Sequence, residues 1–152
     1  PKDETGVQLF SVVQSQQEVM RVCELGTTKS KYRSTRNFAI TCLTGVRTNQ
    51  TDLLGYMQNQ RLAYDSKLIG ARFSAETDAE LKSATASSTY DDTFRGIMQE
   101  YLDSYNSKLT AQLGITTGAN AREILTESQK TAELLIQMVR DDSDKTEAPV
   151  EQ

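Results

Sequence analysis

Apolar side chains recur along most of this chain at alternating spacings of three and four residues. That spacing places them on one face of an α-helix, whereas a half-buried β-strand needs alternation at every second residue. The rhythm is strongest in two stretches, so the chain is expected to fold as an all-α protein. The residues that carry it are Leu43, Val46, Gln50, Leu53, Met57, Gln60, Tyr64 and Leu68 in the first stretch, and Tyr90, Phe94, Ile97, Tyr101, Tyr105 and Leu109 in the second.

Capping signals divide the pattern into about four helices, two or three of them long. The first is predicted to end before Gly26, a residue suited to the left-handed conformation that follows many helices. The second is predicted over residues 35–73 and the third over residues 90–113. Asn120 and Glu123 form a capping pattern for the last helix. Short loops place consecutive helices antiparallel, so the expected architecture is an elongated antiparallel helical bundle.

Two segments fit this pattern less well. Apolar residues alternate with others over residues 37–43, which is compatible with a short irregular or strand-like piece. A single strand without a partner would be unstable, so a helix is preferred there. Residues 74–88 form a long connection, and a short helix is expected inside it because Thr77 and Glu80 match a capping box.

A chain of 152 residues fits one domain, large enough to be stable without a metal. Residues 1–6 are predicted to be a disordered lead, residues 7–140 a single helical-bundle domain, and residues 141–152 an acidic, disordered tail. No apolar run approaches the ~20 residues of a membrane span, so none is predicted. The chain begins at Pro1 without Met, which is compatible with a mature or trimmed product.

The net charge of −4 gives no support to nucleic acid as a partner. Positive charge is nevertheless concentrated in one polar stretch, at Lys29, Lys31, Arg33 and Arg36, interleaved with hydroxyl groups. Such a stretch can bind a phosphate-bearing or otherwise anionic partner through charge and hydrogen bonds. The alternative is a solvated loop that faces acidic helices, or that pairs with the acidic tail of a neighbouring copy.

The two cysteines lie close to the predicted turn between the first and second helices. Cys23 falls near the end of the first helix and Cys42 near the start of the second. In an antiparallel hairpin these positions lie side by side, so a disulfide could close a loop of about 20 residues, worth about 3 kcal/mol. The alternative is two buried thiols that act as small apolar residues. The sequence leaves both open.

The chain contains no histidine and no tryptophan. Nucleophilic catalysis of the Ser-His-Asp or Cys-His kind is therefore excluded, as are zinc sites that use histidine and the Glu-x-x-His sites of di-iron bundles. Two cysteines cannot build a four-cysteine zinc or iron–sulfur site, and no glycine-rich phosphate loop is present. No catalytic residue, no metal site and no cofactor is predicted.

A second set of cations offers a route to chemistry without histidine. Arg61, Lys67, Arg72 and Arg95 could converge in a bundle and bind a carboxylated small molecule. Electrostatic catalysis can use such groups alone. Nothing in their spacing selects these four over other surface cations, and a small histidine-free helical enzyme is kept as an alternative.

The helix faces resemble coiled-coil heptads that are interrupted by polar residues, such as Gln16, Gln50, Gln60 and Ser128. Polar interruptions are tolerated in an interface and are awkward in a dry monomer core. The expected function is therefore a non-enzymatic structural protein that works by protein–protein interaction, as a homo-oligomer or docked into a larger complex of virion, secretion or conjugation type. A binding module that uses residues 29–36 for an anionic partner is the other alternative. An extracytoplasmic or virion-associated location is slightly favoured over a cytoplasmic one.

Overall fold

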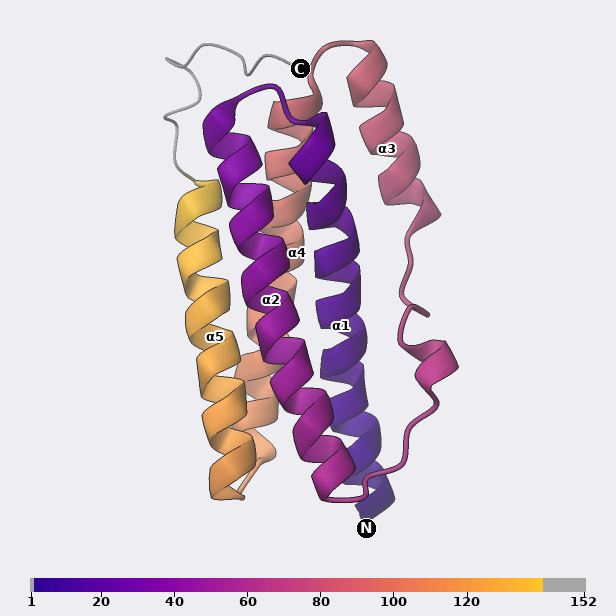
Figure 1. Ribbon diagram of the computed structural model, residues 1–152, viewed down its shortest axis with the longest axis vertical. Helices are drawn as coiled ribbons and strands as arrows, with labels where there is room; N and C mark the ends of the chain where they lie inside the picture. Colours follow the sequence, from indigo (N-terminus) through magenta and orange to yellow (C-terminus); the bar gives the residue numbers. More distant parts are fainter. Residues whose placement is uncertain (1, 141–152) are drawn as a thin grey trace.

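Four long α-helices lie side by side along the long axis of the molecule in the computed structural model, which describes residues 2–140 (Figure 1). A fifth, shorter helix lies outside these four. This arrangement confirms the predicted all-α bundle. The helices are α1 (Lys2–Lys29), α2 (Arg33–Asn59), α3 (Ala75–Ala86), α4 (Tyr90–Ile115) and α5 (Ala119–Val139), with a 3-10 turn, η1 (Ser66–Leu68), between α2 and α3.

The order of the helices is set by one long crossover connection. α1 and α5 each pack against both α2 and α4. α1 and α2 are antiparallel, as are α4 and α5, but α2 and α4 run in the same direction (Figure 1). Residues 60–89, called here the crossover segment, therefore return along the length of the bundle through η1 and α3. Each long helix is thus antiparallel to both long helices that it packs against, which confirms the predicted antiparallel bundle. α2 and α4 are consecutive long helices but run in the same direction, because the connection between them is long enough to span the bundle.

Helix α2 ends at Asn59, so the predicted helix over residues 35–73 is too long. The N–H of Leu62 donates to the carbonyl oxygen of Met57 at 2.9 Å, and Arg61 adopts a φ of 56°. These are the features of a Schellman motif, which satisfies carbonyl groups at a helix end. Glycine usually occupies the left-handed position. Here arginine does, so the sequence carries no signal for the end of this helix.

Other boundaries also differ from those predicted. α1 begins at Lys2, so residues 2–6 are helical and are not a disordered lead. The turn between α1 and α2 is confined to residues 30–32. Residues 37–43 lie within α2, and the strand-like alternative there is wrong because the helical pattern of α2 continues through them. The predicted acidic tail, residues 141–152, lies outside the described residues.

The helix caps are mostly not the residues predicted. Ser74 caps α3, because its Oγ accepts a hydrogen bond from the N–H of Thr77 at 3.1 Å. The short helix expected in this connection is thus present, but Thr77 lies inside it. Gly118 stands at the N-cap of α5, and Asn120 lies within the helix.

Gly26 is not a helix cap but a point of close approach between α1 and α4. A Cβ atom built at Gly26 would lie 2.6 Å from Cε1 of the Phe94 ring. Phe94 is fully buried, and its ring centroid lies 6.1 Å from that of Phe38 and 5.9 Å from that of Tyr90. Only a residue without a side chain leaves room for this ring.

The three buried polar residues that interrupt the helix faces each donate a hydrogen bond within the chain. Gln16 is fully buried, and its Nε2 donates to the hydroxyl of Tyr105 at 2.9 Å. Gln50 donates to a carbonyl oxygen of α1 at 3.1 Å, and Ser128 to a carbonyl oxygen of its own helix at 3.0 Å. Gln60 is exposed at the end of α2. A monomer core accommodates these residues, so they do not by themselves require an interface.

Candidate functional site

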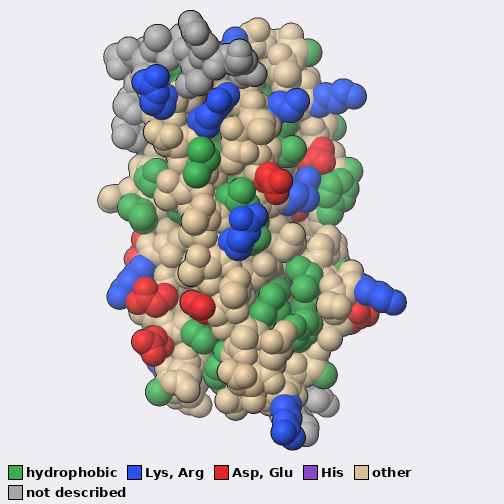
Figure 2. Space-filling model, viewed as in Figure 1, with side chains coloured by type: hydrophobic (Ala, Val, Ile, Leu, Met, Phe, Trp, Pro, Cys, Tyr) green, Lys and Arg blue, Asp and Glu red, His purple; other side chains and the backbone are tan. Residues whose placement is uncertain are grey.

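The cations predicted to bind an anion lie at one end of the bundle, where α1 ends and α2 begins. Figure 2 shows several Lys and Arg side chains gathered near this end, at the top of the view. Lys29, Lys31 and Arg33 are exposed, whereas Arg36 is half-buried and donates to the carbonyl oxygen of Ser30 at 2.8 Å. Most of the stretch is helical, and only its middle forms the turn.

A buried carboxylate, that of Asp91 in the first turn of α4, holds this basic turn in place. Its Oδ1 accepts from the N–H of Lys31 at 2.8 Å, and its Oδ2 from the N–H of Tyr32 at 2.9 Å. Both N–H groups lie at the start of α2, where the helix dipole favours negative charge. The carboxylate therefore fixes the backbone of the turn and offsets part of its positive charge. Pairing of the turn with the acidic tail of another copy involves residues that lie outside those described.

Cys23 and Cys42 form a disulfide, which is the first of the two alternatives that the sequence leaves open. Their Cα atoms are 6.2 Å apart, and both residues are fully buried. The bridge joins α1 to α2 across the basic turn. In the loop-entropy model a bridge of this span stabilises the fold by about 3 kcal/mol.

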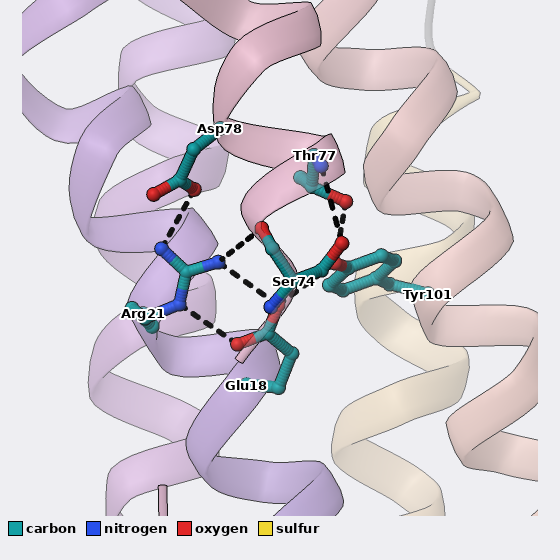
Figure 3. Close-up of polar contacts among 6 residues, drawn as sticks. All are labelled: Glu18, Arg21, Ser74, Thr77, Asp78 and Tyr101. Carbon is teal, nitrogen blue, oxygen red and sulfur yellow. Dashed lines mark hydrogen bonds and ion pairs between the residues drawn. The ribbon is translucent and has the colours of Figure 1, made fainter. Parts of the chain in front are cut away.

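A second polar cluster ties the crossover segment to α1 and α4 (Figure 3). Glu18 is its centre, and accepts from Nε of Arg21 at 2.8 Å and from Nη2 of Arg21 at 2.9 Å. This two-point contact is the preferred geometry of a guanidinium with a carboxylate. Oε2 of Glu18 also accepts from the hydroxyl of Tyr101 at 2.8 Å and from the N–H of Ser74 at 3.2 Å. The Tyr101 hydroxyl lies 2.8 Å from Oγ1 of Thr77 as well.

The guanidinium of Arg21 also reaches α3. Its Nη1 donates to Oδ1 of Asp78 at 2.7 Å, and its central carbon lies 4.4 Å from the centre of the Phe73 ring. Hydrogen bonding to Glu18 raises the pKa of Arg21 above its ordinary value, although burial opposes that shift. Arginine is charged at any working pH, so the cluster acts as a permanent ionic clamp on the crossover segment.

Beside this clamp, a cavity of about 400 Å³ opens between α1, α4 and the crossover segment. It combines hydroxyl groups, aromatic surface and charges of both signs. Its lining residues are Ser15, Glu18 and Val19 on α1, Arg72 on the crossover segment, and Glu100, Tyr101, Ser104 and Tyr105 on α4.

Two cations share one hydroxyl oxygen next to this cavity. Nη2 of Arg72 donates to Oγ of Ser11 at 2.7 Å, and Nζ of Lys108 donates to the same oxygen at 2.8 Å. Nε of Arg72 also donates to Oε1 of Gln14 at 3.4 Å. Burial lowers the pKa of Lys108, and the charge of Arg72 lowers it further. The arrangement can present hydrogen-bond donors from two positive groups to one anion.

The four cations singled out in the sequence do not meet. Only Arg72 lines the cavity, whereas Arg61 and Lys67 are exposed elsewhere on the crossover segment. Arg95 binds a carbonyl oxygen of α5 at 2.9 Å. Sequence reasoning missed Lys108. It lies three residues after Tyr105 and one residue before Leu109, so it stands at the edge of the buried face of α4. That spacing was the available signal.

Within residues 2–140, no group of three or more histidine, cysteine or acidic side chains is arranged to hold a metal ion. None of the helices in this part of the chain is long and apolar enough to cross a membrane. Comparisons of the chain with known protein families, with curated proteins and with solved structures found no match.

Proposed function

We propose that this chain is a non-enzymatic interaction subunit that associates with copies of itself through the crossover segment. The observation that carries the proposal is the exposure of two large apolar side chains on that segment. Leu68 is 49% exposed and Phe73 is 53% exposed. Aromatic and other apolar residues at the centre of a contact surface supply much of the binding free energy between proteins.

The backbone that carries these two side chains is fixed to the bundle. The carbonyl oxygen of Leu68 accepts from Nε2 of Gln14 at 2.9 Å, and the N–H of Ser74 donates to Glu18 at 3.2 Å. A surface that is ordered before binding loses less conformational entropy on association than a loose loop does. This supports a docking role for the segment.

The disulfide supports an oxidising location for the proposed subunit. Disulfides form and persist in oxidising surroundings, such as the periplasm, the cell exterior or a virion surface. An extracytoplasmic or virion-associated subunit of a larger assembly is consistent with the bridge between Cys23 and Cys42.

Light scattering of the purified chain over a range of concentrations tests the proposal. The wild-type chain is expected to form an oligomer whose average mass rises with concentration, and Leu68→Ser and Phe73→Ser are expected to lower that mass. Leu134→Ser is the matched control, because Leu134 is 55% exposed on α5, away from the crossover segment.

Circular dichroism checks that each variant stays folded, which matters for Phe73 because its ring contacts Arg21. Leu68→Ser leaves that contact intact and serves as the second variant. A wild-type chain that stays monomeric at every concentration contradicts the proposal. So does a control variant that dissociates as readily as the other two.

A further inference from the structure

Neither Arg72 nor Lys108 takes part in an ion pair of the described residues. Arg72 comes from the crossover segment and Lys108 from α4, and both donate to Oγ of Ser11 on α1, at 2.7 Å and 2.8 Å. Their side-chain hydrogen-bond acceptors within the described residues are neutral: the Ser11 hydroxyl and the side-chain oxygen of Gln14. The ion pairs of the described chain lie elsewhere, as in the clamp between Glu18 and Arg21.

Two positive groups at one neutral oxygen repel one another. The repulsion is offset when an anion takes hydrogen bonds from both groups, because its negative charge attracts each cation, whereas the hydroxyl oxygen carries no net charge. Lys108 is half-buried, so water screens its charge less than on an open surface. The lowered pKa of Lys108 has these same two causes, burial and the neighbouring Arg72.

The adjoining cavity has room for the rest of a small molecule. Arg72 lines it directly, and Ser104 on its wall lies one helical turn before Lys108 on α4. Ser15 and Ser104 contribute hydroxyl groups to the lining of the cavity, and Val19 and Tyr105 contribute apolar groups. The volume of about 400 Å³ falls within the range of small-molecule sites.

The acidic residues of the cavity restrict the charge of its ligand. Glu18 and Glu100 line the same space, on the side away from Lys108 along the antiparallel helices α1 and α4. The carboxylate of Glu18 is already bound by Arg21 and by the Tyr101 hydroxyl, whereas Glu100 is exposed. A second negative charge on the ligand would be repelled by these groups.

We propose that Arg72, Lys108 and Ser11 bind the carboxylate of a small, singly charged organic acid whose body occupies the cavity between α1 and α4. Arg72 and Lys108 donate hydrogen bonds to the carboxylate oxygens. The Ser11 hydroxyl donates its own hydrogen once the two cations turn to the ligand. Val19, Tyr101 and Tyr105 contact the apolar body.

Isothermal titration at low salt with benzoate and with butyrate tests the site, and inorganic phosphate is the doubly charged comparison. At least one of the two carboxylates is expected to bind saturably, and phosphate more weakly. Arg72→Gln and Lys108→Gln are each expected to weaken carboxylate binding about tenfold, the usual effect of losing one hydrogen bond to a charged group. Lys67→Gln removes the same charge from an exposed position of the crossover segment that does not line the cavity, and is expected to leave binding unchanged.

A nuclear magnetic resonance titration of the Lys108 side chain gives a second readout. Carboxylate binding is expected to raise the pKa of Lys108, since an anion favours the charged amine. Glu100→Gln is expected to narrow the gap in affinity between phosphate and carboxylate.

The proposal is overturned if neither carboxylate binds saturably, or if Lys67→Gln weakens binding as much as Lys108→Gln does. Phosphate that binds more tightly than both carboxylates also overturns it. The same titrations on the Leu68→Ser chain separate this site from self-association, because that change removes a proposed docking side chain and keeps Ser11, Arg72 and Lys108.

Discussion

The hydroxyl of Tyr101 donates a 2.8 Å hydrogen bond to the carboxylate of Glu18, and this contact joins α4 directly to α1. The same carboxylate receives the guanidinium of Arg21 and the backbone N–H of Ser74. Two helices of the bundle and the crossover segment therefore meet at one acidic side chain, which is almost buried. The attachment of the crossover segment to the bundle therefore depends on this residue as well as on the buried apolar contact of Leu81 in α3.

Removal of the Tyr101 hydroxyl tests this dependence. Tyr101→Phe is expected to lower the free energy of unfolding by about 1–2 kcal/mol, since hydrogen bonds to charged groups contribute roughly 1.5–3 kcal/mol and this one is partly exposed. Glu18→Gln is expected to cost more, because it also removes the ion pair with Arg21. A double-mutant cycle of the two, measured by urea denaturation, is expected to give a coupling free energy of about 1 kcal/mol.

Tyr64→Phe is the control for this cycle. Among the described residues, the Tyr64 hydroxyl accepts one hydrogen bond, an exposed one from Nε2 of Gln58 at 3.1 Å. Its loss is expected to change stability by less than about 0.5 kcal/mol. If Tyr101→Phe costs no more than Tyr64→Phe, the clamp does not stabilise the fold.

Alanine at Gly26 is expected to destabilise the protein, although alanine is the better helix former. The new methyl group would meet the Phe94 ring, and overpacking of this kind costs about 1–3 kcal/mol. Gly55→Ala is the matched control, because Gly55 lies inside α2 with open space around it. That change is expected to add about 0.5–1 kcal/mol. The midpoint of thermal unfolding, Tm, should thus fall for Gly26→Ala and rise for Gly55→Ala. A Gly26→Ala variant with a raised Tm would show that α1 and α4 can move apart without a loss of stability.

Reduction of the disulfide is expected to lower the free energy of unfolding by about 3 kcal/mol. Denaturation with and without reductant measures the difference. A variant with both Cys23→Ala and Cys42→Ala should show no response to reductant. Mass spectrometry of the unreduced chain after alkylation is an independent check, and two modified cysteines would contradict the bridge.

Alkaline pH is expected to destabilise the protein through Tyr105. Burial raises the pKa of Tyr105 to about 12, against about 10 in an unfolded chain. The folded state therefore holds the proton more tightly. The resulting stability is fully present below about pH 10 and is lost as the pH rises through about 12, at roughly 1.4 kcal/mol per pH unit.

Urea denaturation from about pH 9, below that window, to about pH 11, halfway through it, measures the effect. Burial also raises the pKa values of Tyr90 and Tyr101, so they contribute in the same direction. Tyr105→Phe removes the acceptor of Gln16 and begins from a lower stability, so the slope against pH is the readout. A slope as steep in Tyr105→Phe as in the wild type would assign the loss to other groups.

Much of the fold can be predicted from local pattern. The spacing of apolar residues is enough to predict the helices, including residues 37–43, because a helix is made of hydrogen bonds four residues apart. The closeness of Cys23 to Cys42 also follows from local geometry, since one short turn separates their helices. The end of α2 does not follow, because Arg61 takes a left-handed conformation that its residue type does not signal.

The contacts of the candidate site also divide into those that the sequence predicts and those that it does not. The ion pair of Glu18 with Arg21 spans a single helical turn and is readable from the sequence. The shared contact of Arg72 and Lys108 with Ser11 cannot be read from the sequence. The hydrogen bonds of Asp91 to the backbone of residues 31 and 32 cannot be read from it either. Both require residues distant in sequence to be brought together.

The sequence by itself thus determined the all-α class, the presence of the long helices and the exclusion of histidine chemistry, because each depends on residue type and short-range spacing. The tertiary structure alone decided that α2 and α4 run in the same direction, and hence that residues 60–89 must return along the bundle. That return brings Ser74 to Glu18 and Arg72 to Ser11. Such contacts follow from the packing of whole helices and the path of their connection, and no local pattern encodes them.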